Sequence, residues 1–196
     1  MVSVISGKIS TLDKAQGLRY LGYNPLAQTV DGLEEEIAFC EREILSAQRL
    51  KAAYKAFDLD IRGDEINLGF AKVNSKSLAK NLDGCKKVAV FACTIGAEVD
   101  RLIAKYQKIS PTRSLIFQAF GSALAEQWAD IVNGEIKAKF GATVNRFSCG
   151  YGDLPIEMQK DVFCALSVEK NLGITLSESY FMTPTKSITA FVGIKN

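Results

Sequence analysis

A chain of 196 residues with a hydrophobic fraction of 47% can bury one core of ordinary size, which predicts a single domain. Its 24 basic and 22 acidic residues are interspersed, and no basic stripe alternates with aromatic residues, so we expect no nucleic-acid partner. The complete lack of histidine excludes Ser-His-Asp and Cys-His triads and argues against a zinc or non-haem iron centre.

The first fifty residues show mainly helical patterns. A short helix is predicted to open at Thr11 or Asp13 and to end before Asn24-Pro25, because the residue before proline avoids the helical region. Apolar residues then recur at helical spacing over 33–50, and Asp31 is a suitable N-cap. These patterns predict a long amphipathic helix and a helical N-terminal part over residues 1–54.

Strand patterns follow. Apolar residues alternate with charged ones over 57–61 and again over 66–70, and Arg62-Gly63-Asp64 between them has the composition of a turn, so a hairpin is predicted. A short helix is expected over 75–82. The run KVAVFAC over 87–93 is typical of a strand that is buried on both faces.

The C-terminal half mixes helices and strands without strict alternation. The predicted elements are helices at 97–106, 111–140 and 155–166 and strands at 142–148, 174–177 and 188–194. Because hairpins occur and the two kinds of element do not alternate, we expect an α+β fold with a mainly antiparallel or mixed sheet packed against long helices.

Cysteine usage and hydropathy indicate the cellular compartment. The five cysteines are widely spaced and form no CxxC pair, which argues against a disulfide framework or a zinc ribbon. No apolar segment reaches ~18 residues, and residues 1–8 lack the pattern of a signal peptide. The sequence therefore predicts a reduced, cytoplasmic protein with no membrane partner.

The best candidate for a binding site is the segment RFSCGYGDLP over residues 146–155. Arg146 can meet a carboxylate with two parallel hydrogen bonds, and Gly150 and Gly152 let a ligand approach the backbone closely. Tyr151 offers an aromatic face. By spacing alone, the segment favours a tight turn with Arg146 in a surface ion pair, since short glycine motifs occur often by chance. A free cysteine is more often a small core residue, and Cys149, in this loop, is the one cysteine for which a redox role is left open.

Three motifs in order give this chain a family resemblance. They are Leu124-Ala125-Glu126, the segment 146–155, and LSESYFMTPTKS over 176–187. Together they resemble the activation (S-adenosylmethionine-binding) domain of cobalamin-dependent methionine synthase over the C-terminal third to half of the chain. The resemblance implies one domain over 1–196, with an activation-domain-like core at 55–196.

The resemblance also implies roles for five residues. Arg146 would bind the methionine carboxylate of S-adenosylmethionine, and Glu126 would face the cationic end of the ligand. The backbone at Ser148 and Gly150 would meet the adenine or the amino-acid part, and Tyr151 would line the site near the methyl group or the cobalamin. The alternative for Glu126 is a surface ion pair with a lysine on the same helix.

The function that the resemblance implies is reactivation in trans. A free-standing activation domain would hold S-adenosylmethionine over the cobalamin of a methionine synthase that lacks its own activation domain, while a flavoprotein supplies an electron. The cobalamin would belong to the partner, and the chain would not be an enzyme by itself. As an alternative, the chain would be a docking or assembly subunit of a corrinoid methyltransferase that does not bind S-adenosylmethionine, because no histidine follows Tyr151 where the family has one. An ordinary doubly wound methyltransferase is disfavoured by the lack of its glycine-loop pattern.

Overall fold

A computed structural model describes residues 1–23 and 32–195. The helices are α1 (Lys14–Tyr20), α2 (Leu33–Ala47), α3 (Lys76–Asn81), α4 (Ala97–Ile109), α5 (Pro111–Phe140), α6 (Gln159–Leu166) and α7 (Val168–Leu172), with a 3-10 turn η1 (Ile156–Met158). The strands are β1 (Ser3–Gly7), β2 (Leu50–Asp58), β3 (Asp60–Arg62), β4 (Glu65–Asn67), β5 (Lys72–Asn74), β6 (Lys87–Thr94), β7 (Thr175–Leu176), β8 (Met182–Thr183) and β9 (Ser187–Ile194). In this part of the chain no helix is long and apolar enough to span a membrane.

The main sheet has the strand order β1-β2-β6-β9, and every pair in it is antiparallel. Two smaller antiparallel sheets, β3-β4-β5 and β7-β8, lie beside it. The predicted α+β fold with a mainly antiparallel sheet is therefore confirmed.

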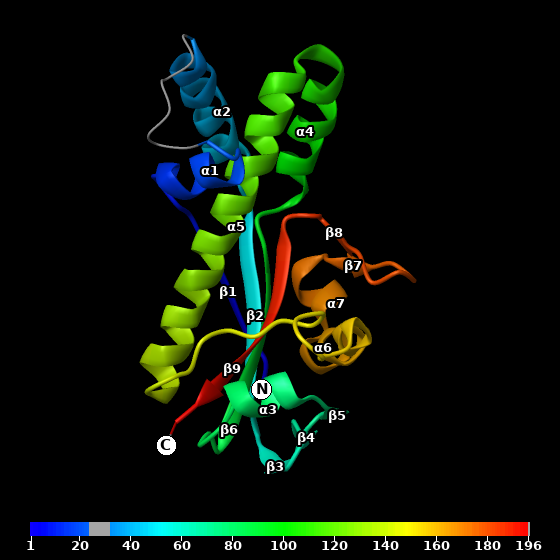
Figure 1. Cartoon of the computed structure of the whole chain (residues 1–196). Coiled ribbons are helices and arrows are strands. Elements are labelled where there is room, and N and C mark those ends of the chain that lie inside the picture. The colour runs from blue at the N-terminus through cyan, green and yellow to red at the C-terminus, as the bar shows by residue number, and fades with distance from the viewer. Residues whose placement is uncertain (24–31, 196) are drawn as a thin grey trace.

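Helices cover both faces of the main sheet (Figure 1). Along β6, the side chains of Ala89, Phe91 and Cys93 belong to the core under α1, α2, α4 and α5. The alternate side chains belong to a second core under α3, α6 and α7. Because successive side chains of a strand point to opposite faces, a strand buried on both sides must be apolar throughout, which explains the KVAVFAC run.

The long helix α5 lies along one side of the sheet (Figure 1). Its start fits the sequence prediction, since Pro111 occupies the first turn and Ser110 Oγ accepts a hydrogen bond from the Arg113 amide at 3.4 Å. Trp128 fixes the middle of the helix to the sheet, because its Nε1 donates to the Lys51 carbonyl at 3.0 Å. The helix therefore holds its exposed polar face at a defined place beside strand β9.

The helical N-terminal part was predicted wrongly in two places. Residues 3–7 form strand β1, and the helix expected over 33–50 ends at Ala47, after which Leu50 begins β2. The sequence LKAAYKAFD suits a helix as well as a strand, and its antiparallel pairing with β1 and β6 decides between them. The predicted break at Asn24-Pro25 and the predicted cap at Asp31 lie outside the described residues.

Other boundaries also differ from the predictions. The turn over 62–64 is confirmed between β3 and β4, but Phe57 belongs to the central strand β2. Residues 142–148 form no continuous strand; they make only the single bridges Thr143–Ile194 and Phe147–Phe191 along β9. This segment thus follows the outer edge of β9 and brings Arg146 back beside α5.

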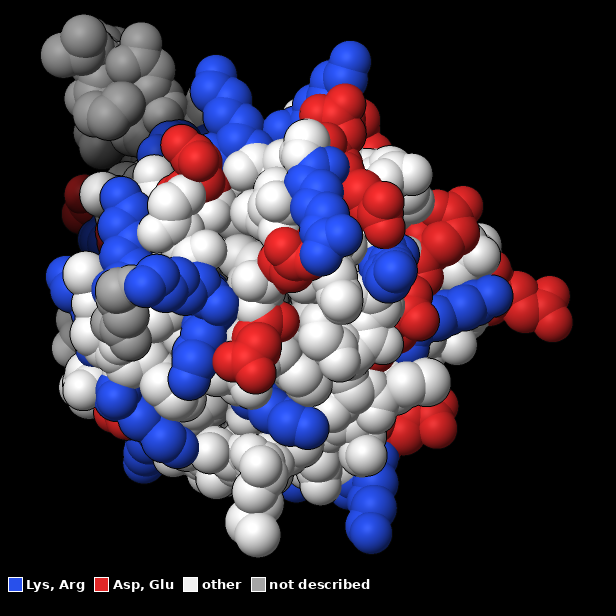
Figure 2. Space-filling view, turned by 90° about the horizontal axis from the view of Figure 1, so that it is seen from below, with Lys and Arg blue, Asp and Glu red and all other residues white. Residues whose placement is uncertain are grey.

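Charged side chains of both signs occur on the face of the molecule that Figure 2 shows, with uncharged surface between them. This agrees with the interspersed charges of the sequence.

Candidate functional site

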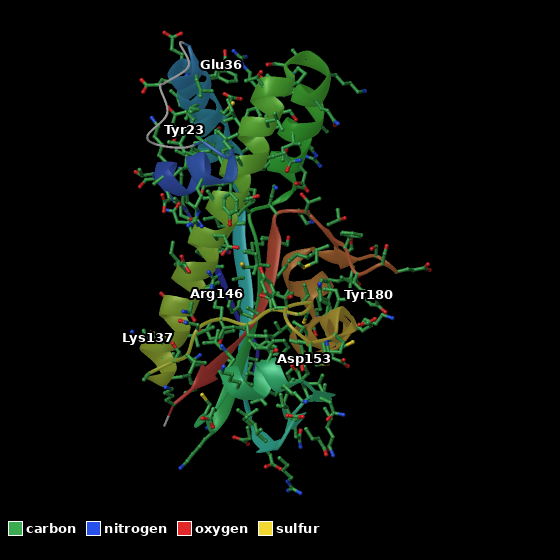
Figure 3. All side chains as sticks on the ribbon, in the orientation of Figure 1. Tyr23, Glu36, Lys137, Arg146, Asp153 and Tyr180 are labelled. Carbon is green, nitrogen blue, oxygen red and sulfur yellow. The ribbon has the colours of Figure 1, made fainter. Side chains whose placement is uncertain are left out.

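Arg146 connects the segment along β9 to helix α5. Its Nη2 donates to Glu126 Oε2 at 3.1 Å and to Asp130 Oδ1 at 2.8 Å. Glu126 and Asp130 are four residues apart on α5, so they lie on the same face of the helix. The Arg146 side chain is 22% exposed, and Figure 3 shows it between α5 and the sheet. Nε and Nη1 of Arg146 make no hydrogen bond to the part of the chain that the structure describes.

A cavity of about 410 Å³ adjoins this cluster. Its wall is formed by Glu126, Asp130, Asn133, Asn145, Arg146, Phe147, Ser148, Tyr151 and Ile188. The Asn133 Oδ1 atom is buried and has no hydrogen-bond partner among the described residues. Pockets of this size hold small organic ligands.

The loop after Ser148 is held by its own hydrogen bonds. The Gly150 amide donates to the Leu154 carbonyl at 3.0 Å, and the Tyr151 amide donates to the Ser148 carbonyl at 3.2 Å. Gly150 has φ 84°, in the left-handed region that glycine adopts without strain. Its N–H is therefore used inside the loop. Tyr151 lines the cavity and is 67% exposed, and its ring contacts Phe147 edge-on.

Asp153 anchors this loop to the start of α3, and sequence reasoning did not find this role. Its carboxylate accepts hydrogen bonds from Ser75 Oγ at 2.6 Å, the Lys76 amide at 2.8 Å and the Ser77 amide at 3.0 Å. These bonds, that from Ser75 first, hold the pKa of Asp153 well below its usual range. No local signal links two positions nearly eighty residues apart, so only the tertiary structure shows that α3 fixes the loop.

Not all of the five predicted site residues lie at the cavity. Glu126, Arg146, Ser148 and Tyr151 line the cavity, but Gly150 does not. The partner of Glu126 is Arg146 and not a lysine on the same helix. The structure thus brings four of the five residues together, and their roles toward a ligand stay predictions.

Sequence reasoning missed Asp130, Asn133 and Asn145. Asp130 could have been found from helical periodicity, because it lies one turn after Glu126. Asn145 immediately precedes Arg146, but its place in the cavity wall depends on how the segment runs along β9.

The loop cysteine is unsuited to thiol chemistry. Cys149 is buried, and burial raises the pKa of its thiol to about 12. Cys149 thus fits the expectation of a small core residue, and its burial argues against the redox role that was left open for it. Cys164 is the exposed cysteine of the described residues.

Comparisons with known proteins match this chain to one family of domains and to one solved structure of similar fold. The family model for the vitamin B12 dependent methionine synthase activation domain matches residues 76–196. A crystal structure of the MetH reactivation domain bound to AdoHcy superposes with a TM-score of 0.77 at 16% sequence identity, covering 100% of this chain and 78% of that chain. The match in fold includes the N-terminal strands that lie outside the family-model match, and the family-model match includes the whole segment from Glu126 to Tyr151.

Proposed function

Because the chain belongs to the family of vitamin B12-dependent methionine synthase activation domains, we propose that it binds S-adenosylmethionine beside Arg146 and supports reductive remethylation of a partner's cobalamin. The partner would be a methionine synthase that lacks its own activation domain. The electron would come from a flavoprotein.

The observation that carries this proposal is the charge pattern of the cavity. S-adenosylmethionine has one carboxylate, one ammonium and one sulfonium. The cavity is lined by the Arg146 guanidinium and by two carboxylates on α5. Only Nη2 of the guanidinium bonds to these carboxylates, which leaves Nε and Nη1 for a ligand. An arginine fork binds a carboxylate in a fixed orientation, and nearby carboxylates stabilise cationic groups.

The residues of this chain would act by holding the methyl donor in place. Arg146 would bind the ligand carboxylate, and Glu126 would face its cationic groups. The cobalamin would supply the cobalt that accepts the methyl group. Since the chain has no histidine to offer as a ligand to cobalt, the partner would hold the cobalamin. The exposed Tyr151 ring would lie toward the partner. Positioning of this kind accelerates a reaction through proximity and orientation.

The proposal is tested by titration of the purified protein with S-adenosylmethionine, followed by calorimetry or by NMR where binding is weak. Arg146→Ala should raise Kd about 10- to 100-fold, because charge-assisted hydrogen bonds contribute roughly 1.5–3 kcal/mol. Arg146→Lys should recover part of the affinity, since it keeps the charge but not the fork. Arg101→Ala, which removes an arginine that is 71% exposed outside the cavity, is the matched control. Unchanged affinity in Arg146→Ala would contradict the proposal.

One observation favours the alternative of a docking or assembly subunit. The family resemblance assigns the backbone at Gly150 to the ligand, but the Gly150 amide donates to the Leu154 carbonyl within the loop. If the wild-type protein binds no S-adenosylmethionine even with a cobalamin-loaded synthase fragment present, but does bind that fragment, the docking role would replace the methyl-donor role.

A further inference from the structure

A second cavity lies at the opposite edge of the main sheet from Arg146. It has a volume of about 420 Å³ and lies where β1 ends and α2 leads into β2, whereas the Arg146 cavity adjoins β9 at the other edge. Its wall is formed by Ser6, Gly7, Lys8, Leu45, Ser46, Gln48, Arg49, Leu50 and Lys51. Three of these described residues are basic and none is acidic, so the wall carries a formal charge of about +3 at neutral pH.

The register of β1 against β2 fixes Lys8 opposite Arg49. The ladder between the two strands ends at Gly7, immediately before Lys8. Immediately after Lys8, the Gln48 side chain accepts from the Ile9 amide at 2.9 Å and donates to the Ile9 carbonyl at 2.8 Å. Because Gln48 itself precedes Arg49, the two chains are tied together on both sides of the Lys8 and Arg49 positions.

Lys51 adds a third positive charge on the same face. Lys51 lies directly opposite Ser6, and alternate residues of a strand point to the same face of a sheet. Lys8, Arg49 and Lys51 are all exposed, and none of them forms an ion pair within the described part of the chain. Like charges that face each other across two strands destabilise the pairing. An anion bound between them would remove this repulsion.

Arg49 is held in place by contacts that leave one edge of its guanidinium open. Its amide donates to the Ile95 carbonyl at 2.8 Å, and a Cβ atom added at Gly96 would lie 2.8 Å from Arg49 Cβ, so its stem packs against this backbone. Its Nη1 donates to the carbonyls of Ser46 at 3.2 Å and Gln48 at 2.7 Å. Nε and Nη2 make no hydrogen bond to the described residues, and two parallel N–H groups of this kind bind two oxygens of one phosphate or carboxylate.

The acidic residues near this cavity are balanced by other basic residues. An adjoining hollow shares Ser46 and Arg49 with the cavity, and its charged residues besides Arg49 are Glu43, Glu98, Arg101 and Lys105. These are two acidic and two basic side chains, and Glu98 is paired with Arg101. The positive charge of the cavity is therefore not neutralised from this side.

We infer that the cavity lined by Lys8, Arg49 and Lys51 is a binding site for a small molecule that carries a phosphate group. A phosphate monoester has a charge of about −2 at neutral pH and three acceptor oxygens. The open edge of Arg49 would bind two of these oxygens, and the flexible lysine side chains would bind the third as point charges. The cavity volume exceeds that of a phosphate ion and leaves room for an organic part. The inference does not depend on the proposed function, because it concerns another cavity and other residues.

The test is a titration of the full chain at constant ionic strength, followed by NMR of the backbone amides. The probes are glycerol 3-phosphate, inorganic phosphate and acetate. The proteins are the wild type, Arg49→Lys, the double variant Lys8→Gln with Lys51→Gln, and the double variant Lys86→Gln with Lys87→Gln. The last variant makes the same charge change at two exposed lysines outside the cavity and is the matched control. The amide spectra also show whether each variant keeps its fold.

Glycerol 3-phosphate should produce saturable shifts at the amides of Gly7 and Leu50, whereas acetate should produce none that saturate. The double variant of Lys8 and Lys51 should raise Kd on the order of tenfold or more, because charge-assisted hydrogen bonds to the phosphate are lost. Arg49→Lys should raise Kd about threefold, since it keeps the charge but loses the fork. The control variant should stay within about twofold of the wild type, because solvent and salt screen distant charges.

Four results would overturn the inference. They are the lack of any saturable shift with glycerol 3-phosphate, equal shifts with acetate, and an equal loss of affinity in the control variant, which would assign the effect to net charge. The fourth is that inorganic phosphate binds as tightly as glycerol 3-phosphate, which would show that the cavity takes the free ion and not a larger phosphorylated molecule.

Discussion

Gly152 lies where the glycine-rich loop touches helix α3, and replacing it with alanine tests how closely the two segments approach. Gly152 has φ 57°, a conformation that residues with a side chain adopt only at a cost. A Cβ atom there would lie 2.5 Å from Ser77 Oγ and 2.8 Å from Ser77 Cβ. Neither segment can move apart easily, because Asp153, the next residue, binds the first amides of the same helix.

The expected cost has two parts. Alanine in the left-handed region costs about 1 kcal/mol, and the close contact with Ser77 costs roughly 1–3 kcal/mol, as overpacking usually does. Gly152→Ala should therefore lower the free energy of unfolding by about 2–4 kcal/mol. Gly63→Ala is the matched control, since Gly63 has φ 63° but no atom within 4 Å of the added Cβ. It should cost only about 1 kcal/mol.

Urea unfolding followed by circular dichroism measures both values. Repeating the measurement in a Ser77→Gly background isolates the contact, because the cost of Gly152→Ala should then fall toward that of Gly63→Ala. The reasoning fails if Gly152→Ala and Gly63→Ala cost the same in the wild-type background, or if Ser77→Gly does not reduce the cost of Gly152→Ala.

Two further predictions concern ionisable groups. The pKa of Asp153 is lowered in the folded state, so its stabilising effect is complete above the ordinary aspartate pKa and is lost as the pH falls toward the folded value. The stability difference between the wild type and Asp153→Asn, taken from urea midpoints, should therefore shrink below about pH 4, and a difference that stays constant down to pH 3 would contradict this role. Burial raises the pKa of the Cys40, Cys93 and Cys149 thiols to about 12. Iodoacetamide at pH 8 should modify the exposed Cys164 first in the native protein, as peptide mass mapping would show, and rapid modification of Cys149 would refute its burial.

The sequence predicted α4 and α5 well, because helical periodicity and end signals are local, whereas the short helix α7 was not predicted. Ser110-Pro111 marked the start of α5, and Gly141 marked its end. The strands were predicted less well. Residues 50–58 carry no clear alternation, and β1 is short, so their identity depends on pairing with partners far along the chain.

The candidate site was predicted in part. The family resemblance pointed to Glu126, Arg146, Ser148 and Tyr151, and the fold places all four on one cavity. Gly150 was also expected there, but it does not line the cavity, and its amide donates to the Leu154 carbonyl within the loop. Asp130 and Asn133 were missed. Helical periodicity places Asp130 one turn after Glu126, but no local signal shows that this face of α5 lies beside the segment along β9.

The sequence by itself determined the helical periods, the buried strand β6, the absence of histidine chemistry and the motif order that identifies the family. These properties depend on residue types at short spacing. The tertiary structure decided the strand order, the anchoring of the loop by Asp153 and the sharing of Arg146 between two carboxylates. Each of these depends on which distant segments of the chain pack together.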